Sequence, residues 1–153
     1  MSIIFNKADK SHIEKYIIHR IEFIKSLGGT FKNEDEFINN TRLFLEQNIP
    51  LGNAVIFIAE NNGEIVSSAM AVIYNTLPMS YTPSGKCSII YNVYTKKACR
   101  GKGYAKTLLN MLIKHLKDNN VEEIMIKYTS EGKPLYEKLG FKQLEDYMVY
   151  YPL

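Results

Sequence analysis

The stretch that decides the fold is Arg100-Gly101-Lys102-Gly103-Tyr104-Ala105-Lys106, about two-thirds of the way along the chain. The apolar, β-branched run 87–95 before it predicts a strand, and the leucine stripe after it predicts a helix from Gly103 to about Lys117. Glycine has no Cβ, so a ligand can come close to the backbone, and the free amides of a helix start attract phosphate oxygens. The turn between this strand and this helix therefore predicts a pyrophosphate-binding loop.

The charge around this loop supports an anionic ligand. The net charge of the whole chain is only +3, too small to indicate nucleic acid as a partner. No Asp or Glu occurs between Glu64 and Asp118, so no acid is expected to compete for the ligand, and the interval holds these basic residues: Lys86, Lys96, Lys97, Arg100, Lys102, Lys106, Lys114 and Lys117. A solvated basic surface would have the same composition, so charge alone leaves both interpretations open.

Two other phosphate-binding motifs do not match this loop. A P-loop ends in Gly-Lys-Ser/Thr, but Lys106-Thr107 follows Ala105. The dinucleotide-binding fingerprint needs a third small residue where Lys106 stands, and it usually lies near the start of a repeated β-α-β array. Neither motif explains the loop.

The remaining pattern predicts a single α+β domain over residues 1–153, with a partly antiparallel sheet and one parallel unit near its middle. Ser11 and Glu14 form a candidate capping box for the first helix, and Asn33 opens the second. The turn 61–63 predicts a hairpin between two strands. The expected elements are strand 3–7, helix 11–27, helix 33–50, strands 54–60, 64–74 and 87–95, helix 103–117, strand 121–128, helix 133–139 and strand 146–151.

Composition excludes several classes of protein. Hydrophobic residues make up 46% and charged residues 23%, the balance of a soluble globular protein. The longest apolar run, 54–59, is far too short to span a membrane, and residues 1–10 lack the features of a signal peptide. Two cysteines without grouped histidines predict no disulfide scaffold and no metal site. We therefore expect a cytoplasmic protein.

The pattern Arg100-x-x-Gly103-x-Ala105 resembles the acyl-CoA-binding signature of the GNAT superfamily of N-acetyltransferases. A second stretch, Pro134-Leu-Tyr-Glu-Lys-Leu-Gly-Phe141, resembles the late helix and turn of that family. The order of the elements also matches, so the resemblance covers nearly the whole chain and is strongest from Tyr91 to Phe141. It implies three layers, with a mixed, mostly antiparallel twisted sheet between helices and two parallel strands that splay at the acyl-CoA site.

The same resemblance implies where acetyl-CoA binds. The backbone of Val93, Tyr94 and Thr95 would pair with pantetheine. The amides of the loop would hold the pyrophosphate, through Arg100, Gly101, Lys102, Gly103, Tyr104, Ala105 and Lys106. Thr129 or Ser130 stands where many members have an asparagine that contacts the cofactor, and this is a departure from the family pattern.

Tyr136 matches the position of the family's proposed general acid. A thiolate leaves when an amine attacks a thioester, and a nearby phenol can protonate it. Packing of a short helix is the alternative role for one of 11 tyrosines. The glutamate that many members carry on the strand before the loop is absent, since Asn92 is no base; Glu22, Glu123 or a water relay remain candidates.

These observations predict an N-acetyltransferase that uses acetyl-CoA and no metal, with direct attack by a primary amine in a ternary complex. A small-molecule amine is the favoured acceptor, and a protein amino terminus or lysine is the second hypothesis. A third hypothesis is an acyl-CoA-binding sensor without turnover. The identity of the amine and the oligomeric state, including a homodimer, stay open.

Overall fold

The computed structural model describes residues 2–144 and 146–152. The elements follow in the order β1 (Ile4–Lys7), η1 (Lys10–His12), α1 (Ile13–Ser26), α2 (Glu34–Leu51), β2 (Ala54–Asn61), β3 (Glu64–Asn75), β4 (Lys86–Thr95), η2 (Lys97–Cys99), α3 (Tyr104–Asp118), β5 (Glu123–Ile126) and α4 (Lys133–Lys138). The α+β class and the boundaries of most elements are confirmed to within a few residues.

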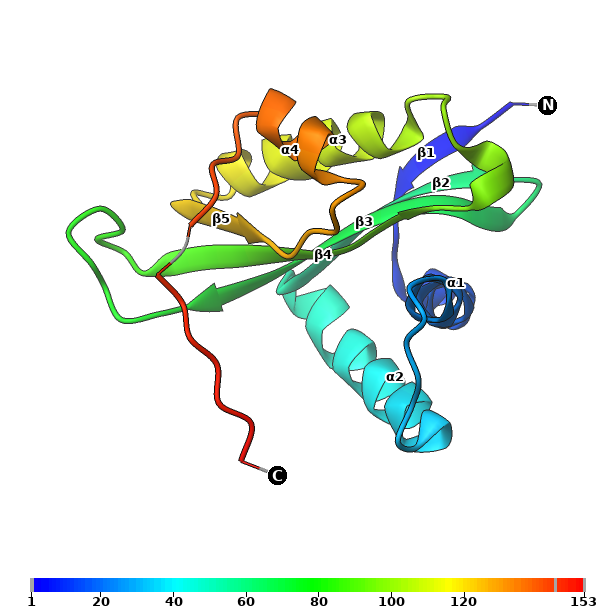
Figure 1. Ribbon diagram of the computed structural model, residues 1–153, viewed down its shortest axis with the longest axis horizontal. Coiled ribbons are helices and arrows are strands. Elements are labelled where there is room, and N and C mark those ends of the chain that lie inside the picture. Colours follow the sequence, from blue (N-terminus) through cyan, green and yellow to red (C-terminus); the bar gives the residue numbers. More distant parts are fainter. Residues whose placement is uncertain (1, 145, 153) are drawn as a thin grey trace.

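Three layers make up the molecule (Figure 1). A twisted five-stranded sheet in the order β1-β2-β3-β4-β5 lies between α3 and α4 on one face and α1 and α2 on the other. The three pairs β1–β2, β2–β3 and β3–β4 are antiparallel, and the last pair, β4–β5, is parallel. The three-layer arrangement with a mixed, mostly antiparallel sheet is therefore confirmed.

Each face of the sheet has its own core. On one side the leucine stripe of α3 packs on strands β2 to β4, and Leu108, Leu109, Leu112 and Leu116 are fully buried. On the other side Tyr16 and Ile17 of α1 and Leu45 of α2 pack on Ile56 and Ile58. Successive side chains of β2 lie alternately in one core and in the other. Almost all residues of this strand are therefore apolar.

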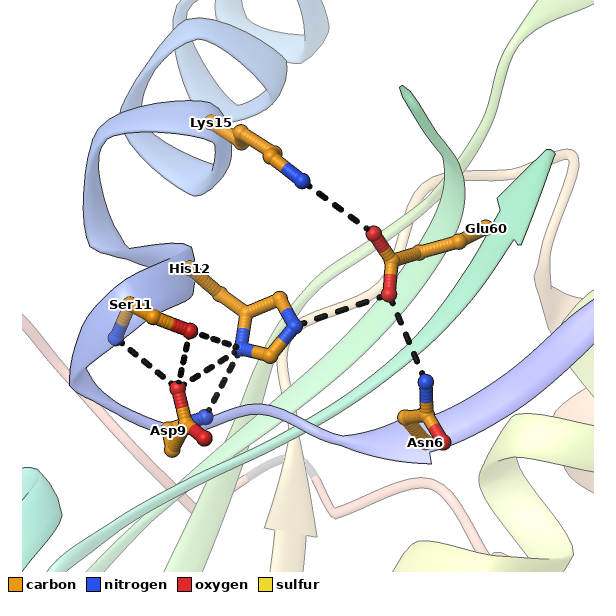
Figure 2. Close-up of polar contacts among 6 residues, drawn as sticks. All are labelled: Asn6, Asp9, Ser11, His12, Lys15 and Glu60. Carbon is orange, nitrogen blue, oxygen red and sulfur yellow. Dashed lines mark hydrogen bonds and ion pairs between the residues drawn. The ribbon is translucent and has the colours of Figure 1, made fainter. Parts of the chain in front are cut away.

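The start of the first helix differs from the prediction. The cap is Asp9, whose carboxylate accepts from the Ser11 backbone amide at 2.8 Å, while the Asp9 amide donates to Nδ1 of His12 at 3.1 Å (Figure 2). A short 3-10 turn, η1, comes before α1, so the Ser11–Glu14 capping box was wrong. Glu14 instead accepts two hydrogen bonds from Arg42 of α2. Asp9 caps η1, and α1 itself begins at Ile13 after His12 without a side-chain cap, so the predicted helix start at Ser11 lies inside η1.

His12 also connects this cap to the sheet. Its Nε2 lies 3.5 Å from a carboxylate oxygen of Glu60 on β2, and Lys15 and Asn6 reach the same carboxylate at 3.4 Å (Figure 2). These contacts of the Glu60 carboxylate link β1, β2 and the start of α1.

The predicted last strand was also wrong. Residues 146–151 form no strand, and the described chain there is irregular and exposed. Strand β5 is therefore an edge strand, and the parallel β4–β5 pair lies at the edge of the sheet rather than near its middle. Strand propensity in Tyr147, Val149 and Tyr150 does not form a strand unless a neighbouring backbone supplies the hydrogen bonds. No helix in the described ranges is long and apolar enough to cross a membrane.

Candidate functional site

Strand β4 is paired on both sides in its first half only. On one side, β3 pairs with it from Lys86 to Thr95. On the other side, the ladder with β5 ends at the pair Ile90 and Ile126, followed by one bond from the Lys127 amide to the Ile90 carbonyl at 3.3 Å. Beyond Ile90, β4 has no strand on its β5 side among the described residues. The backbone of Val93, Tyr94 and Thr95 lies in this open half, and the family resemblance predicts the pantetheine contacts at these three residues.

A β-bulge marks the start of the open half. The β3–β4 register shifts between Ser68 and Met70, and Asn92 at the bulge has φ 55°. The Asn92 side chain is buried, with its Oδ1 3.2 Å from Nη1 of Arg20 on α1, while the Ser68 hydroxyl donates to the Asn92 carbonyl at 3.2 Å. Asparagine tolerates this left-handed backbone better than most residues, so the bulge explains why a polar residue occupies a buried position on β4.

The glycine loop ends in a bare helix start. Gly101 and Gly103 both have φ 78°, and a Cβ added at either would meet no protein atom within 4 Å. Gly103 is the N-cap of α3, and no side chain of the described residues caps the helix there. The first amides of α3 thus lie at an open surface without a protein acceptor side chain, as the sequence predicted for an anion-binding turn.

The basic residues of the loop fall into two groups. The first group, Lys96 and Arg100, has acidic partners, so the expectation that no acid competes with the ligand for these cations was wrong. The Lys96 ammonium pairs with Glu64 at the start of β3 and lies 3.7 Å from Glu22 of α1. The contact with Glu64 raises the pKa of Lys96. Arg100 donates from Nε to the Thr95 carbonyl at 3.0 Å and has Glu131 at 3.9 Å. Acids far away in the sequence therefore occupy two of the loop's cations.

The second group is free of such partners. Within the described ranges, no carboxylate lies at ion-pair distance from the loop residues Lys97, Lys102 and Lys106, and all three are exposed. These are the cations available to an anion that binds at the start of α3.

Tyr136 lies on α4 with its ring in the core on the α3 side of the sheet. The residue is 7% exposed, its ring meets that of Phe141 edge-on at 6.2 Å between centroids, and burial is the cause of its pKa shift, with no hydrogen bond from a described residue to its hydroxyl. A Cβ at Gly132 would come within 2.8 Å of that hydroxyl oxygen, so glycine is needed there to leave room for the phenol. Burial raises the pKa of Tyr136, which keeps the phenol protonated at neutral pH.

The other predicted site residues are Ser130 or Thr129 and the candidate bases Glu22 and Glu123. Ser130 is exposed in the turn between β5 and α4, while the Thr129 carbonyl accepts from the amides of Gly132 and Lys133. Glu123, one of the candidate bases, lines the same hollow as Tyr136 beside β5, whereas Glu22 faces Lys96 instead. No group of three or more His, Cys, Asp and Glu side chains that could hold a metal occurs in the described residues.

Sequence reasoning missed one buried group, His19. Its ring stacks on Tyr94 at 5.0 Å between centroids, and it is only 2% exposed. Burial, together with the nearby charge of Lys96, lowers the pKa of His19 to about 4, so the imidazole is neutral at pH 7. Nothing in the local sequence pattern indicates that His19 lies against the open half of β4.

Comparison with known proteins supports this geometry. The chain matches the model of the acetyltransferase (GNAT) family over residues 21–141. It is similar to the structure of a predicted acetyltransferase with acetyl-CoA from Clostridium acetobutylicum, with 23% identity, a TM-score of 0.91, and coverage of 98% of this chain and 96% of that one. No curated protein matches the sequence.

Two further proteins with the same fold are named for acceptors of different kinds. Glucosamine-6-phosphate N-acetyltransferase from Arabidopsis thaliana has 22% identity, a TM-score of 0.74 and 99% coverage of both chains. Ribosomal-protein-alanine N-acetyltransferase from Brucella melitensis biovar Abortus 2308 has 16% identity, a TM-score of 0.71, and coverage of 98% of this chain and 99% of that one. The fold therefore accommodates small-molecule and protein acceptors with similar overall likeness.

Proposed function

Because this chain belongs to the acetyltransferase (GNAT) family, we propose that it transfers the acetyl group of acetyl-CoA to the primary amine of a small molecule, by direct attack in a ternary complex. The observation that carries the proposal is the junction of two features: the half of β4 without a β5 partner leads through the short turn η2 to the uncapped glycine start of α3. The first offers backbone hydrogen bonds for an extended ligand, and the second offers amides for a pyrophosphate.

Acetyl-CoA fits both features. Its phosphates would lie at the amides of Arg100 to Lys106, where Lys97, Lys102 and Lys106 lack acidic partners among the described residues. Its pantetheine arm would pair with Val93, Tyr94 and Thr95. Arg100 acts chiefly on the loop itself, since its Nε already donates to Thr95.

Tyr136 would act as the general acid. The amine nitrogen attacks the thioester carbon, a C–N bond forms, the C–S bond breaks, and the phenol donates its proton to the departing sulfur. A raised pKa keeps this proton in place at neutral pH. The attacking nitrogen gives its proton to water, because the open half of β4 carries no carboxylate.

A small amine is preferred to a basic peptide because of the charge on the α1 side of the bulge. Arg20 lies against Asn92 there and has no ion-pair partner within the described residues, and its guanidinium lies 5.4 Å from the Phe37 ring centroid. A free cation at this place disfavours a lysine-rich protein segment.

Thiol release from acetyl-CoA with a panel of amines tests the proposal. We expect turnover with one or more small primary amines and none with lysine-rich peptides. Peptide turnover alone would support the protein acceptor. Binding of acetyl-CoA by calorimetry without turnover on any amine or peptide would favour the sensor.

A further inference from the structure

Arg20 of α1 differs from the other two arginines of the chain in its charge partners. Arg42 donates to both carboxylate oxygens of Glu14, and Arg100 has a carboxylate oxygen of Glu131 at 3.9 Å. In the described part of the chain, Arg20 has no carboxylate at ion-pair distance, and its one hydrogen bond runs from Nη1 to Oδ1 of Asn92. The remaining N–H groups of this guanidinium are therefore available to a ligand.

The aromatic ring of Phe37 on α2 orients the Arg20 guanidinium. The Cζ atom of Arg20 lies over this ring, 5.4 Å from its centroid, and Phe31 contacts the same ring at 4.9 Å between centroids. Arg20 is half-buried, so water screens its charge less than that of an exposed lysine. Its planar fork of N–H groups matches the oxygen atoms of a carboxylate or a phosphate.

The position of Arg20 along β4 coincides with that of the thioester in the complex proposed above. With the pyrophosphate at the start of α3, the pantetheine arm runs back along β4 from Thr95 to Val93. The acetyl group then comes next, at the bulge of Asn92, whose side chain bonds to Arg20. The placement of Arg20 beside the thioester thus rests on the proposed function.

Arg20 and Tyr136 approach this point from opposite faces of the sheet. The Asn92 side chain contacts α1 through Arg20, whereas the next residue, Val93, packs against the core on the α3 side, which also contains Tyr136. Because the phenol that donates to the departing sulfur lies on the α3 side, the α1 side is left for the acceptor amine. A group that binds Arg20 there belongs to the acceptor rather than to acetyl-CoA.

We propose that Arg20 binds an anionic group of the acceptor, a carboxylate or a phosphate, so that the substrate is a small amine with a negative charge a few bonds from its nitrogen. The guanidinium donates two parallel hydrogen bonds to this group, and such charge-assisted bonds are stronger than neutral ones. The anion also supplies the charge partner that this half-buried cation lacks among the described residues. Arg20 selects the acceptor and takes no part in the proton transfers.

Two matched pairs of amines test the role of Arg20: β-alanine with β-alaninamide, and 2-aminoethyl phosphate with ethanolamine. We expect kcat/KM for at least one anionic amine to exceed that of its neutral partner by about tenfold or more. Arg20→Gln should lower this ratio by about tenfold or more, and Arg20→Lys, which keeps the charge without the planar fork, should retain part of the preference. The comparison of one ratio between proteins cancels the different basicities of the amines.

The matched control is Arg42→Gln. Arg42 is also a half-buried arginine, but it lies on α2 and is already paired with Glu14, so this variant should leave the ratio of anionic to neutral turnover unchanged. Faster turnover of β-alanine would identify the anion as a carboxylate, and faster turnover of 2-aminoethyl phosphate would identify it as a phosphate.

Failure of this role and failure of the proposed function give different results. Neutral amines that react as fast as anionic ones, or a loss in Arg20→Gln that is equal for both, would overturn the role of Arg20 in selecting the acceptor and make it a support of the bulge, with acetyl transfer intact. Binding of acetyl-CoA without turnover of any amine would overturn the proposed function and the role of Arg20 with it.

Discussion

The two halves of β4 differ in pairing, and the difference separates stability from function. From Cys87 to Ile90 the strand has neighbours on both sides, and Cys87, Ser88 and Ile90 are buried. From Tyr91 to Thr95 it pairs with β3 alone, contains the bulge at Asn92, and is followed by η2 and then the glycine loop. A completed ladder leaves no backbone group for a ligand, whereas an interrupted one does. The proposed acetyl-CoA site lies where the sheet stops being regular.

Loss of the Tyr136 hydroxyl should have the largest effect on turnover. Tyr136→Phe is expected to lower turnover by roughly 10²- to 10⁴-fold, the range for general acid–base catalysis, with acetyl-CoA affinity nearly unchanged because the ring still packs on Phe141. Tyr16→Phe removes a buried hydroxyl on the opposite face and should keep turnover close to that of the unmodified protein. Full activity of Tyr136→Phe would make this tyrosine a packing residue.

The pH profile sharpens the same assignment. Activity should rise with pH toward the pKa of the acceptor amine, because no dedicated base is expected. Since burial raises the pKa of Tyr136, the loss of activity by ionisation of the phenol should come above pH ~10, and Tyr136→Phe should lack that loss. Initial rates in Glu22→Gln and Glu123→Gln check the rising limb; a plateau near neutrality that either variant abolishes would identify a base.

The paired half should respond in stability rather than in catalysis. Ile90 is fully buried and paired on both sides, so Ile90→Ala is expected to cost about 2–5 kcal/mol of unfolding free energy, measured by urea denaturation. Val93→Ala, in the open half and only half-buried, should cost clearly less. Equal losses at the two positions would mean that both halves of β4 contribute alike to the core.

Substitution of the helix-start glycine should weaken acetyl-CoA binding. Gly103→Val places a branched side chain in the open space before α3, and calorimetry should show at least about a tenfold increase in the dissociation constant. Because φ 78° strains any other residue, the control is Gly52→Ala, a glycine with φ 75° and equally open space at the end of α2. Unchanged affinity in Gly103→Val would remove the phosphate site from this loop.

The smallest effect is expected at Arg100. Its guanidinium is half-exposed and already bonded to the Thr95 carbonyl, so Arg100→Ala should weaken binding only about two- to fivefold. Affinity of the unmodified protein should fall with added salt, since Lys97, Lys102 and Lys106 are exposed. A loss in Arg100→Ala as large as that in Gly103→Val would assign the binding to the side chain instead of the amides.

Local patterns in the sequence predicted a large part of this molecule. Gly101 and Gly103 adopt the positive φ that the turn needs, and α3 buries the expected leucines, because both depend on residues a few positions apart. The same holds for Asn33, which caps α2 with its side chain as expected. Tyr136 was located by its motif, but its burial and the space left by Gly132 depend on how α4 packs on the sheet.

Other features depend on segments far apart in the chain, and only the tertiary structure determined them. An interval without acids still meets acids in space, since Glu64, Glu22 and Glu131 come to Lys96 and Arg100 from three other segments. Local sequence likewise does not set where the β4–β5 ladder ends. The clearest case is 146–151, which has the composition of a strand and lacks a neighbour in the described chain. Residue type determines which backbone conformation is favoured, whereas a strand also requires a second backbone beside it, and only the folded arrangement determines whether one is there.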